Sequence, residues 1–295
     1  MTSSLGLLDP LSIGNMLVNG LLLGGLFALT AFGLSVFVGV MRVINIAHGD
    51  LAVLSAYFAL SMMLHLKVDP FISLIAVMPI MFVIGYTLQR FVINRLLPMG
   101  ANQPVIAIFA LSIVIQNLLL LTFTADARSL IVPYLLEPLD LFGISISRRY
   151  GVGFLTALIM FAAIYFFLKR TYIGKAMRAV PFDIEAAKML GIRPHSVYNF
   201  AAGLAMIAVA VAGVLLGMVF TFYPNTGPMF LLLSFGAIVV GGVGSLKGTL
   251  VGGIIIGEAL VLGGYLGSYY QLMFCYLVIL AILIARPQGI FGERF

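Results

Sequence analysis

The stretch SVYNFAAGLAMIAVAVAGVLLGMVFTF, residues 196–222, runs without a single charged side chain. It is longer than the ~20 apolar residues that cross a lipid bilayer as an α-helix. The rest of the chain has the same character, with 62% hydrophobic residues, 9% charged residues and a mean hydropathy of +1.18. Charged residues make up about 25% of a typical soluble domain. We therefore expect an all-α, polytopic membrane protein.

Apolar runs of similar length recur along the whole sequence. We place membrane spans near residues 11–36, 51–66, 71–91, 104–123, 151–168, 196–222, 229–245, 250–266 and 269–285. Some of these runs are short or merge at glycines, so we expect about eight to ten spans with broken or re-entrant segments. The polar segments between them are too short to fold alone. Residues 1–295 are therefore treated as a single transmembrane domain.

The basic residues gather at residues 90–95, 169–193 and 286–294. Loops rich in Lys and Arg stay in the cytoplasm, so nine spans would put these three segments inside and the N-terminus outside. The net charge of +6 arises from loops and span ends, so we expect no nucleic-acid binding. No Lys or Arg precedes Met41, which argues against a cleavable signal peptide. The single Cys275 excludes an intrachain disulfide or a Cys-rich metal site.

Residues 169–195 form the only long polar segment, which we expect to be a cytoplasmic loop. Asp183 is a suitable N-cap for a short helix over residues 184–190, with Glu185 in its first turn. Gly191 stands where a left-handed residue commonly ends a helix. Two helical turns are not stable alone in water. This favours docking into a partner, while packing against the chain's own membrane domain remains the alternative.

A second polar interruption, GVMRVINIAHGD, covers residues 39–50. Charged residues between apolar runs are costly unless they are paired or lie at the interface. The segment is either a turn at the cytoplasmic end or a re-entrant segment beside a transport path. His48 and Asp50 suggest a proton relay, although a structural role for His48 is favoured. Polar residues within apolar runs are also suited to helix–helix hydrogen bonds. As a candidate substrate path we take the following polar residues: Asn15, Asn19, Asn45, His48, Gln116, Asn117 and Glu258.

The segment GGVGSLKGTLVGG, residues 241–253, is rich in glycine at four-residue spacing. Small residues at such spacing let helix backbones approach closely, and a helix break at residues 241–242 is the alternative. The order Lys247, Gly248, Thr249 does not match a phosphate-binding loop, so this chain is not expected to hydrolyse nucleotide. The predicted helix-packing residues are Gly244, Gly248, Gly252, Gly253 and Gly257.

Three segments in order resemble one family of transport proteins. EAAKMLG, residues 185–191, is similar to the E-A-A-x-x-x-G core of ABC importer permeases, although the I-x-L-P part of that motif is absent downstream. That departure resembles the branch that carries branched-chain amino acids. GVMRVINIAHGDL at 39–51 and GGVGSLKGTLVGG at 241–253 are similar to the signatures near the two ends of that branch. The resemblance spans nearly the whole chain and is closest to its "H"-like permeases.

The resemblance implies a permease subunit of an ABC importer in the bacterial inner membrane, not an enzyme. It implies a second permease subunit, two cytoplasmic ATPase subunits that hold the ATP, and a periplasmic binding protein, with no cofactor or metal in this chain. Residues matching the part of the motif that contacts the ATPase are Gly174, Arg178, Asp183, Glu185, Ala186, Ala187, Leu190 and Gly191.

Other functions remain open from the residues alone. A related permease would carry urea or short amides, and a secondary transporter or channel would use the same spans without an ATPase. An intramembrane enzyme ranks lowest, because its acid–base candidates are limited to His48, Asp50 and Glu258.

Overall fold

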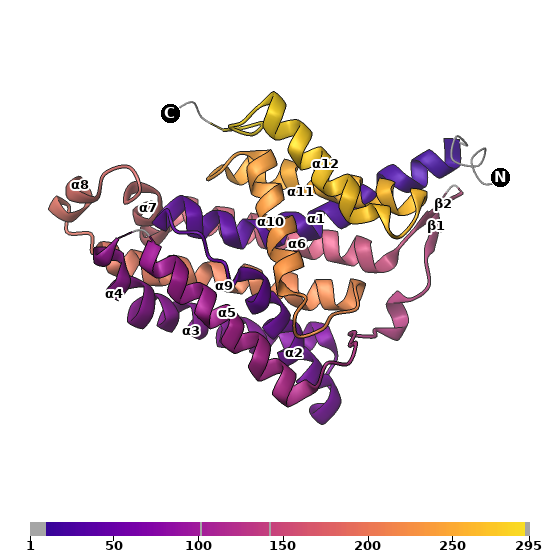
Figure 1. Ribbon diagram of the computed structural model, residues 1–295, viewed down its shortest axis with the longest axis horizontal. Helices are drawn as coiled ribbons and strands as arrows, with labels where there is room; N and C mark the ends of the chain where they lie inside the picture. The colour runs from indigo at the N-terminus through magenta and orange to yellow at the C-terminus, as the bar shows by residue number, and fades with distance from the viewer. Residues whose placement is uncertain (1–9, 101, 142, 293–295) are drawn as a thin grey trace.

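The computed structural model describes residues 10–100, 102–141 and 143–292 of the chain (Figure 1). The expectations about the first nine residues and Arg294 lie outside these ranges. Seven helical runs in the described part are long and apolar enough to cross a membrane, and two apolar helices are shorter. The expected polytopic helical fold is confirmed.

The long runs are α1 (Pro10–Met41), α2 (His48–Leu66), Pro70–Met99, α5 (Asn102–Phe123), α6 (Arg148–Arg170), α9 (Pro194–Val219) and α11 (Leu246–Leu266). The run Pro70–Met99 consists of α3 (Pro70–Leu88), a π-helical turn (Gln89–Ile93), α4 (Asn94–Leu96) and a 3₁₀ turn (Leu97–Met99). The shorter apolar helices are α10 (Gly227–Gly241) and α12 (Tyr270–Ala285).

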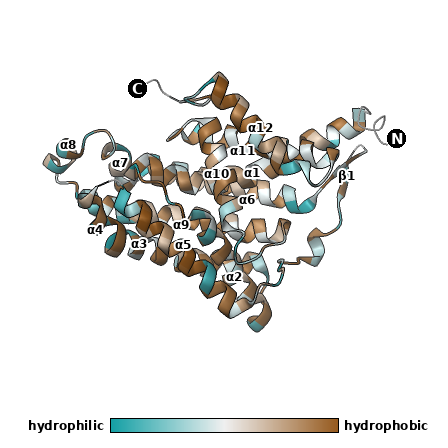
Figure 2. Cartoon of the chain, viewed as in Figure 1, coloured by the Kyte–Doolittle hydropathy of each residue, from teal (hydrophilic) through white to brown (hydrophobic). Residues whose placement is uncertain are grey.

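The two ends of the bundle differ in structure and charge. At one end lie α7 (Tyr172–Ala179) and α8 (Ile184–Met189), close to α4 (Figure 1). At the other end, β1 (Leu139–Leu141) and β2 (Ile144–Ile146) form an antiparallel hairpin beside the start of α1. We name these the basic end and the hairpin end. Figure 2 shows hydrophilic residues at α7 and α8 and hydrophobic residues along the long helices.

Helices α1 and α9 form the buried centre, whereas most residues of α3, α5 and α6 are only partly buried or exposed. Exposed apolar helices are suited to contact lipid or another membrane subunit. Helix α11 runs antiparallel to α1, with Gly253 against Ala28 and Gly257 against Gly24. A Cβ at either α11 glycine would overlap the α1 backbone, so these glycines permit the close approach of the two helices.

The other predicted packing glycines fall into two groups. Gly248 and Gly252 face α10, against Gly241 and Ala237. Gly244 is not on this helix face, because α11 begins only at Leu246 and Gly244 lies in the preceding turn with φ of 81°. The alternative break at residues 241–242 does occur, since α10 ends at Gly241 and φ of Gly242 is 108°.

Two short non-helical segments return into the interior of the bundle. The inner return segment, residues 42–47, follows the end of α1 at the basic end and leads to α2. The outer return segment, residues 220–226, follows the end of α9 at the hairpin end and leads to α10. The re-entrant interpretation of residues 39–50 therefore describes the fold. In Figure 1 the first turns of α2 and α10 lie beside each other deep in the bundle.

Candidate functional site

The segment at the basic end is built from two capped helices. Thr171 caps α7 by accepting a hydrogen bond from the Gly174 N–H at 3.0 Å. Asp183 caps α8, since its Oδ1 accepts from the Ala186 N–H at 2.9 Å. Gly191 follows α8 with φ of 77°, the left-handed conformation that glycine adopts without strain. The observed helix ends at Met189, one residue before the expected end.

The outward side of α8 carries large apolar side chains. Phe182 and Met189 are each 88% exposed and Leu190 is 78% exposed, whereas Ala187 is buried. Ala186, Ala187 and Leu190 do not form one small-residue face, because Leu190 lies past the last helical residue and is exposed whereas Ala187 is buried. Large apolar side chains held outward on a short helix are typical of a contact with another protein.

Charged residues border this apolar surface. Glu185 and Lys188 form an exposed ion pair at 2.7 Å, and Arg178 is also exposed. Exposed pairs of this kind contribute little to stability, about 0.2–1 kcal/mol. Gly174 lies against the backbone of Leu168, where a Cβ would overlap it. Glu185 and Arg178 are therefore available for surface contacts, whereas Gly174 fixes the turn between α6 and α7.

In the interior, α2 and α10 meet through their N-terminal ends. We name this contact the helix junction. A Cβ at Gly49 would overlap the Gly227 carbonyl group, and a Cβ at Gly227 would overlap the Asp50 carboxyl group. Asp50 is 1% exposed, and a carboxyl group is favourable at the positive ends of helices.

Helix α5 supplies the hydrogen-bond donors for Asp50. The Ser112 hydroxyl donates to Asp50 Oδ2 at 2.5 Å and the Gln116 amide donates to Oδ1 at 2.9 Å. Gln116 was a predicted path residue, whereas Ser112 was missed. The signal that identifies Ser112 is its position four residues before Gln116, on the same face of the helix.

Asn45 in the inner return segment and His48 directly after it were both predicted path residues, and their hydrogen bonding differs. His48 Nε2 lies 2.9 Å from the Thr30 carbonyl oxygen of α1, and no bond to Asp50 occurs among the described residues. The proposed His48–Asp50 relay pair is therefore not formed. Asn45 is 0% exposed, and neither of its amide atoms has a hydrogen-bond partner within the part of the chain that the structure describes.

The remaining predicted path residues do not gather at one site. Asn15 and Asn19 hold strand β2, with the Ser145 N–H donating to Asn15 Oδ1 at 2.7 Å. Asn117 faces outward and donates to the Ile113 carbonyl of its own helix at 2.8 Å. Glu258 lies against Gly20 of α1. Its Oε2 is buried without a partner among the described residues.

A cavity of about 400 Å³ opens toward the hairpin end between α1, α6, α11 and α12. We name it the outer vestibule. Its size lies within the usual range for small-molecule sites, about 300–1,000 Å³. Apolar and neutral polar side chains line it, which suits a small, partly apolar solute. The lining residues are Asn19, Leu23, Tyr150, Phe220, Leu260, Val261, Gly264, Tyr265 and Gln271.

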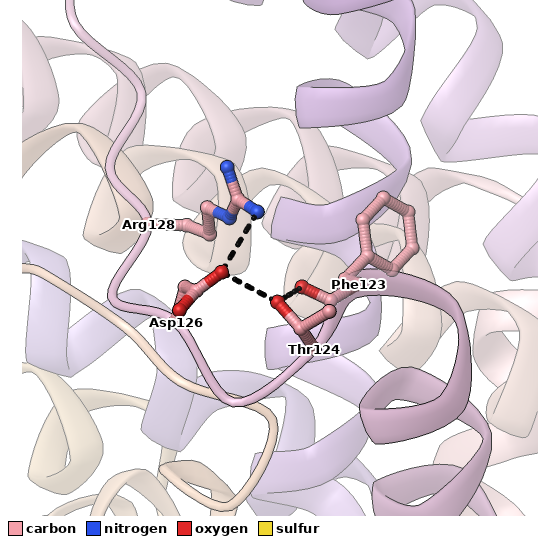
Figure 3. A network of polar contacts seen from close by, with 4 residues as sticks. All are labelled: Phe123, Thr124, Asp126 and Arg128. Carbon is pink, nitrogen blue, oxygen red and sulfur yellow. Dashed lines mark hydrogen bonds and ion pairs between the residues drawn. The ribbon is translucent and has the colours of Figure 1, made fainter.

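The loop after α5 fixes the outer return segment. Figure 3 shows the Thr124 hydroxyl donating to Asp126 at 2.6 Å and Arg128 pairing with Asp126 at 3.5 Å. The backbone of Arg128 exchanges two hydrogen bonds with Phe222, at 3.0 and 2.8 Å. Phe222 is fully buried and meets the Tyr57 ring edge-on, with centroids 5.0 Å apart.

A second contact at the hairpin end joins the same loop to α3. The Tyr134 hydroxyl donates to Asp69 Oδ2 at 2.9 Å, while Asp69 Oδ1 caps α3. Partial burial, with the Asp69 carboxylate beside it, raises the pKa of Tyr134 to about 12. The Tyr134 hydroxyl therefore keeps its proton at physiological pH and can donate to Asp69 there.

Comparison with known proteins gives the family. Residues 16–283 match the family described as "Branched-chain amino acid transport system / permease component". The chain belongs to this family. It is therefore a multi-pass transport permease and not an enzyme, and the resemblance to branched-chain amino acid permeases is confirmed. No group of three or more potential metal ligands occurs in the described residues.

Several curated relatives are similar over nearly their full length. The high-affinity branched-chain amino acid transport system permease protein BraD of Pseudomonas aeruginosa is 30% identical over 94% of this chain and 95% of its own. LivH of Escherichia coli K12 is 29% identical over 93% and 94%, and the probable LivH of Methanocaldococcus jannaschii is 26% identical over 97% and 95%. No solved structure matches.

Proposed function

We propose that this chain is the permease subunit of an ABC importer in a bacterial inner membrane, and that residues 1–295 act as one transmembrane domain. Branched-chain amino acids are the proposed substrates, because the three relatives described above carry that name. Transport of urea or short amides has no comparable support. We further propose that the basic end faces the cytoplasm, as expected for loops rich in Lys and Arg.

The exposed apolar surface of α8 is the observation that carries this proposal. Phe182, Met189 and Leu190 project from the basic end, and burying them would remove a large apolar area from water. Two cytoplasmic ATPase subunits, each docking on one permease, would cover such surfaces. In this proposal they hold the ATP, and Glu185 and Arg178 border the contact.

The opposite end suits delivery of substrate from a periplasmic binding protein. The outer vestibule offers neutral polar groups from Tyr150, Tyr265 and Gln271 beside apolar side chains. Such a lining binds a solute weakly, which a passage requires because tight binding would slow release. A second permease subunit would cover part of the exposed faces of α3, α5 and α6.

The coupling role of α8 is tested with Glu185→Lys in the complete importer in proteoliposomes. The substitution breaks the pair with Lys188 and puts a cation at a positive helix end. We expect ATP hydrolysis to persist while uptake falls by about tenfold, a typical size for coupling between sites. Glu137→Lys, the same charge change on an exposed side chain of the outer loop, is the control.

Unchanged uptake by Glu185→Lys would contradict the coupling assignment. The partners themselves are tested by extraction of the native membrane in mild detergent and mass identification of co-purifying chains. An ATPase pair and a second permease support the proposal. A chain that purifies and transports alone would instead indicate a channel or a secondary transporter.

A further inference from the structure

The inner return segment is attached to the loop between α7 and α8. At its start, Arg42 adopts φ of 54°, and its guanidinium Nη2 donates to the Pro181 carbonyl oxygen at 3.1 Å. Pro181 stands two residues before Asp183, the cap of α8. A displacement of α8 therefore reaches Arg42 through one backbone carbonyl. A hydrogen bond from a charged donor is stronger than a neutral one.

The segment has little slack between its two ends. His48 lies against Thr30 and Gly33, which stand eleven and eight residues before the end of α1 at Met41. At 1.5 Å per residue this is a depth of about 12–16 Å along α1. Six residues reach at most about 20 Å when extended. The segment therefore has limited length in which to absorb a displacement of Arg42 before the turn at residues 46–47 and His48 are reached.

Burial alternates over residues 42–45, and residues 46–47 form a turn in which the His48 N–H donates to the Asn45 carbonyl oxygen at 3.2 Å. Arg42 and Ile44 are exposed, whereas Val43 and Asn45 are buried. Side chains on alternating sides are the pattern of an extended strand. The segment therefore carries displacement along its length while its inward side chains remain in the packed interior.

At its far end the segment leads directly into the helix junction. His48 begins α2, Gly49 touches Gly227 of α10, and Asp50 accepts hydrogen bonds from Ser112 and Gln116 of α5. Backbone-to-backbone contact at Gly49 leaves no flexible side chain to absorb a shift. Movement of the first turn of α2 must therefore displace α10, α5 or both.

Asn45 carries an energetic cost in this arrangement. Its amide is buried, with no partner for either polar atom among the described residues, and a buried unpaired polar group is destabilising. A shift of the extended segment would change which groups the amide faces. An element with two alternative packings is what allows one site to influence another.

We propose that Arg42 is a positioning residue for transport, and that the inner return segment links the loop between α7 and α8 to the helix junction in the membrane. The proposal rests on the proposed function, because it assigns the path by which docking of an ATPase at α8 changes the interior. Asn45 belongs to the link as the side chain whose environment differs between its two positions.

The first test compares Arg42→Met with Arg95→Met in the complete importer in proteoliposomes. Both changes remove an exposed guanidinium at the basic end, but Arg95 makes no hydrogen bond to the loop in the described structure. The readout is the number of substrate molecules imported per ATP hydrolysed. We expect Arg42→Met to lower this ratio by about fivefold or more, with ATP hydrolysis and assembly retained, and Arg95→Met to leave it unchanged.

An unchanged ratio in Arg42→Met would overturn the proposal, as would an equal fall in both variants. Failure of the proposed function gives a different result, because the unaltered importer would then show no ATP-dependent uptake at all. Arg42→Lys sharpens the test. It keeps the charge on a shorter side chain, so partial recovery of the ratio supports the hydrogen bond as the active feature.

The second test replaces Asn45 by Val, which has no polar atoms and is only slightly larger than Asn. We expect a higher melting temperature of the purified complex, because the unpaired amide is removed, and fewer molecules imported per ATP. A raised melting temperature with normal import would show that Asn45 has no part in the link. A lowered melting temperature would show that the amide is already satisfied, and either outcome overturns its assigned role.

Discussion

The two return segments lead to the same helix junction but are held very differently. The outer segment is fixed by two backbone hydrogen bonds between Phe222 and Arg128 and by the buried Phe222 ring. Thr226 adds a hydrogen bond from the Tyr223 N–H at 2.8 Å. The inner segment makes one side-chain hydrogen bond, from its first residue, Arg42. It also contains the buried Asn45 amide, which has no partner among the described residues.

We infer from this difference that the outer return segment acts as a fixed anchor and the inner return segment as a movable link. A segment fixed at several points along its backbone keeps its position when a neighbour moves, whereas a segment held mainly at its ends follows them. The outer return therefore fixes α10 from the hairpin end, and the inner return is free to adjust α2 from the basic end. Changes in the outer segment should affect stability, and changes in the inner one should affect coupling.

The largest effect is expected at the junction that both segments share. Gly49→Val places side-chain atoms where the Gly227 carbonyl group lies, and backbone cannot move aside as a flexible side chain can. We expect loss of assembled complex, measured as the yield of a single species after extraction in mild detergent. Gly151→Val is the control, because nothing lies within 4 Å of a Cβ there. Normal assembly of Gly49→Val would show that the two helices need not touch.

A smaller effect is expected from Phe222→Ala in the outer return segment. Removing a fully buried aromatic ring leaves a cavity and typically costs about 3–5 kcal/mol. The melting temperature of the complex should fall, while import per ATP stays normal at temperatures where the complex is intact. Phe291→Ala, at an exposed side chain outside α3, α5 and α6, should change the melting temperature little. A fall in import per ATP would remove the distinction between anchor and link.

The smallest effect is expected from Thr226→Val, which removes the hydroxyl that accepts from the Tyr223 N–H. A single hydrogen bond contributes about 0.5–1.5 kcal/mol, so a small decrease in melting temperature should follow without any change in import per ATP. Thr122→Val, whose hydroxyl bonds only within its own exposed helix, is the matched control. An equal decrease in both variants would show that Thr226 does not anchor the segment.

Much of the fold could be predicted because membrane spans need long apolar runs. The expected spans near 104–123 and 196–222 agree with α5 and α9 to within a few residues. The cap of α8 could also be predicted from the sequence, because Asp183 and Gly191 act through their immediate neighbours. Gly244 was misplaced, since four-residue spacing does not show where a helix begins.

The candidate site was much harder to predict from the sequence. The predicted path residues were chosen as polar residues in apolar runs, but such a residue can serve a loop, its own helix or the interior. Asn15 bonds to β2, Asn117 to its own helix and Gln116 to Asp50. These partners are distant in sequence or hidden by the choice of helix face, so only the packed structure distinguishes them.

By itself, the sequence determined the class of protein, the approximate spans, the basic end and the short capped helix, because apolar length, charge distribution and helix caps are local properties. The tertiary structure decided that residues 42–47 enter the bundle, that α2 and α10 meet at Gly49 and Gly227, and that Arg42 contacts Pro181. These contacts join residues far apart in the chain. They depend on how whole helices pack, which no local pattern specifies.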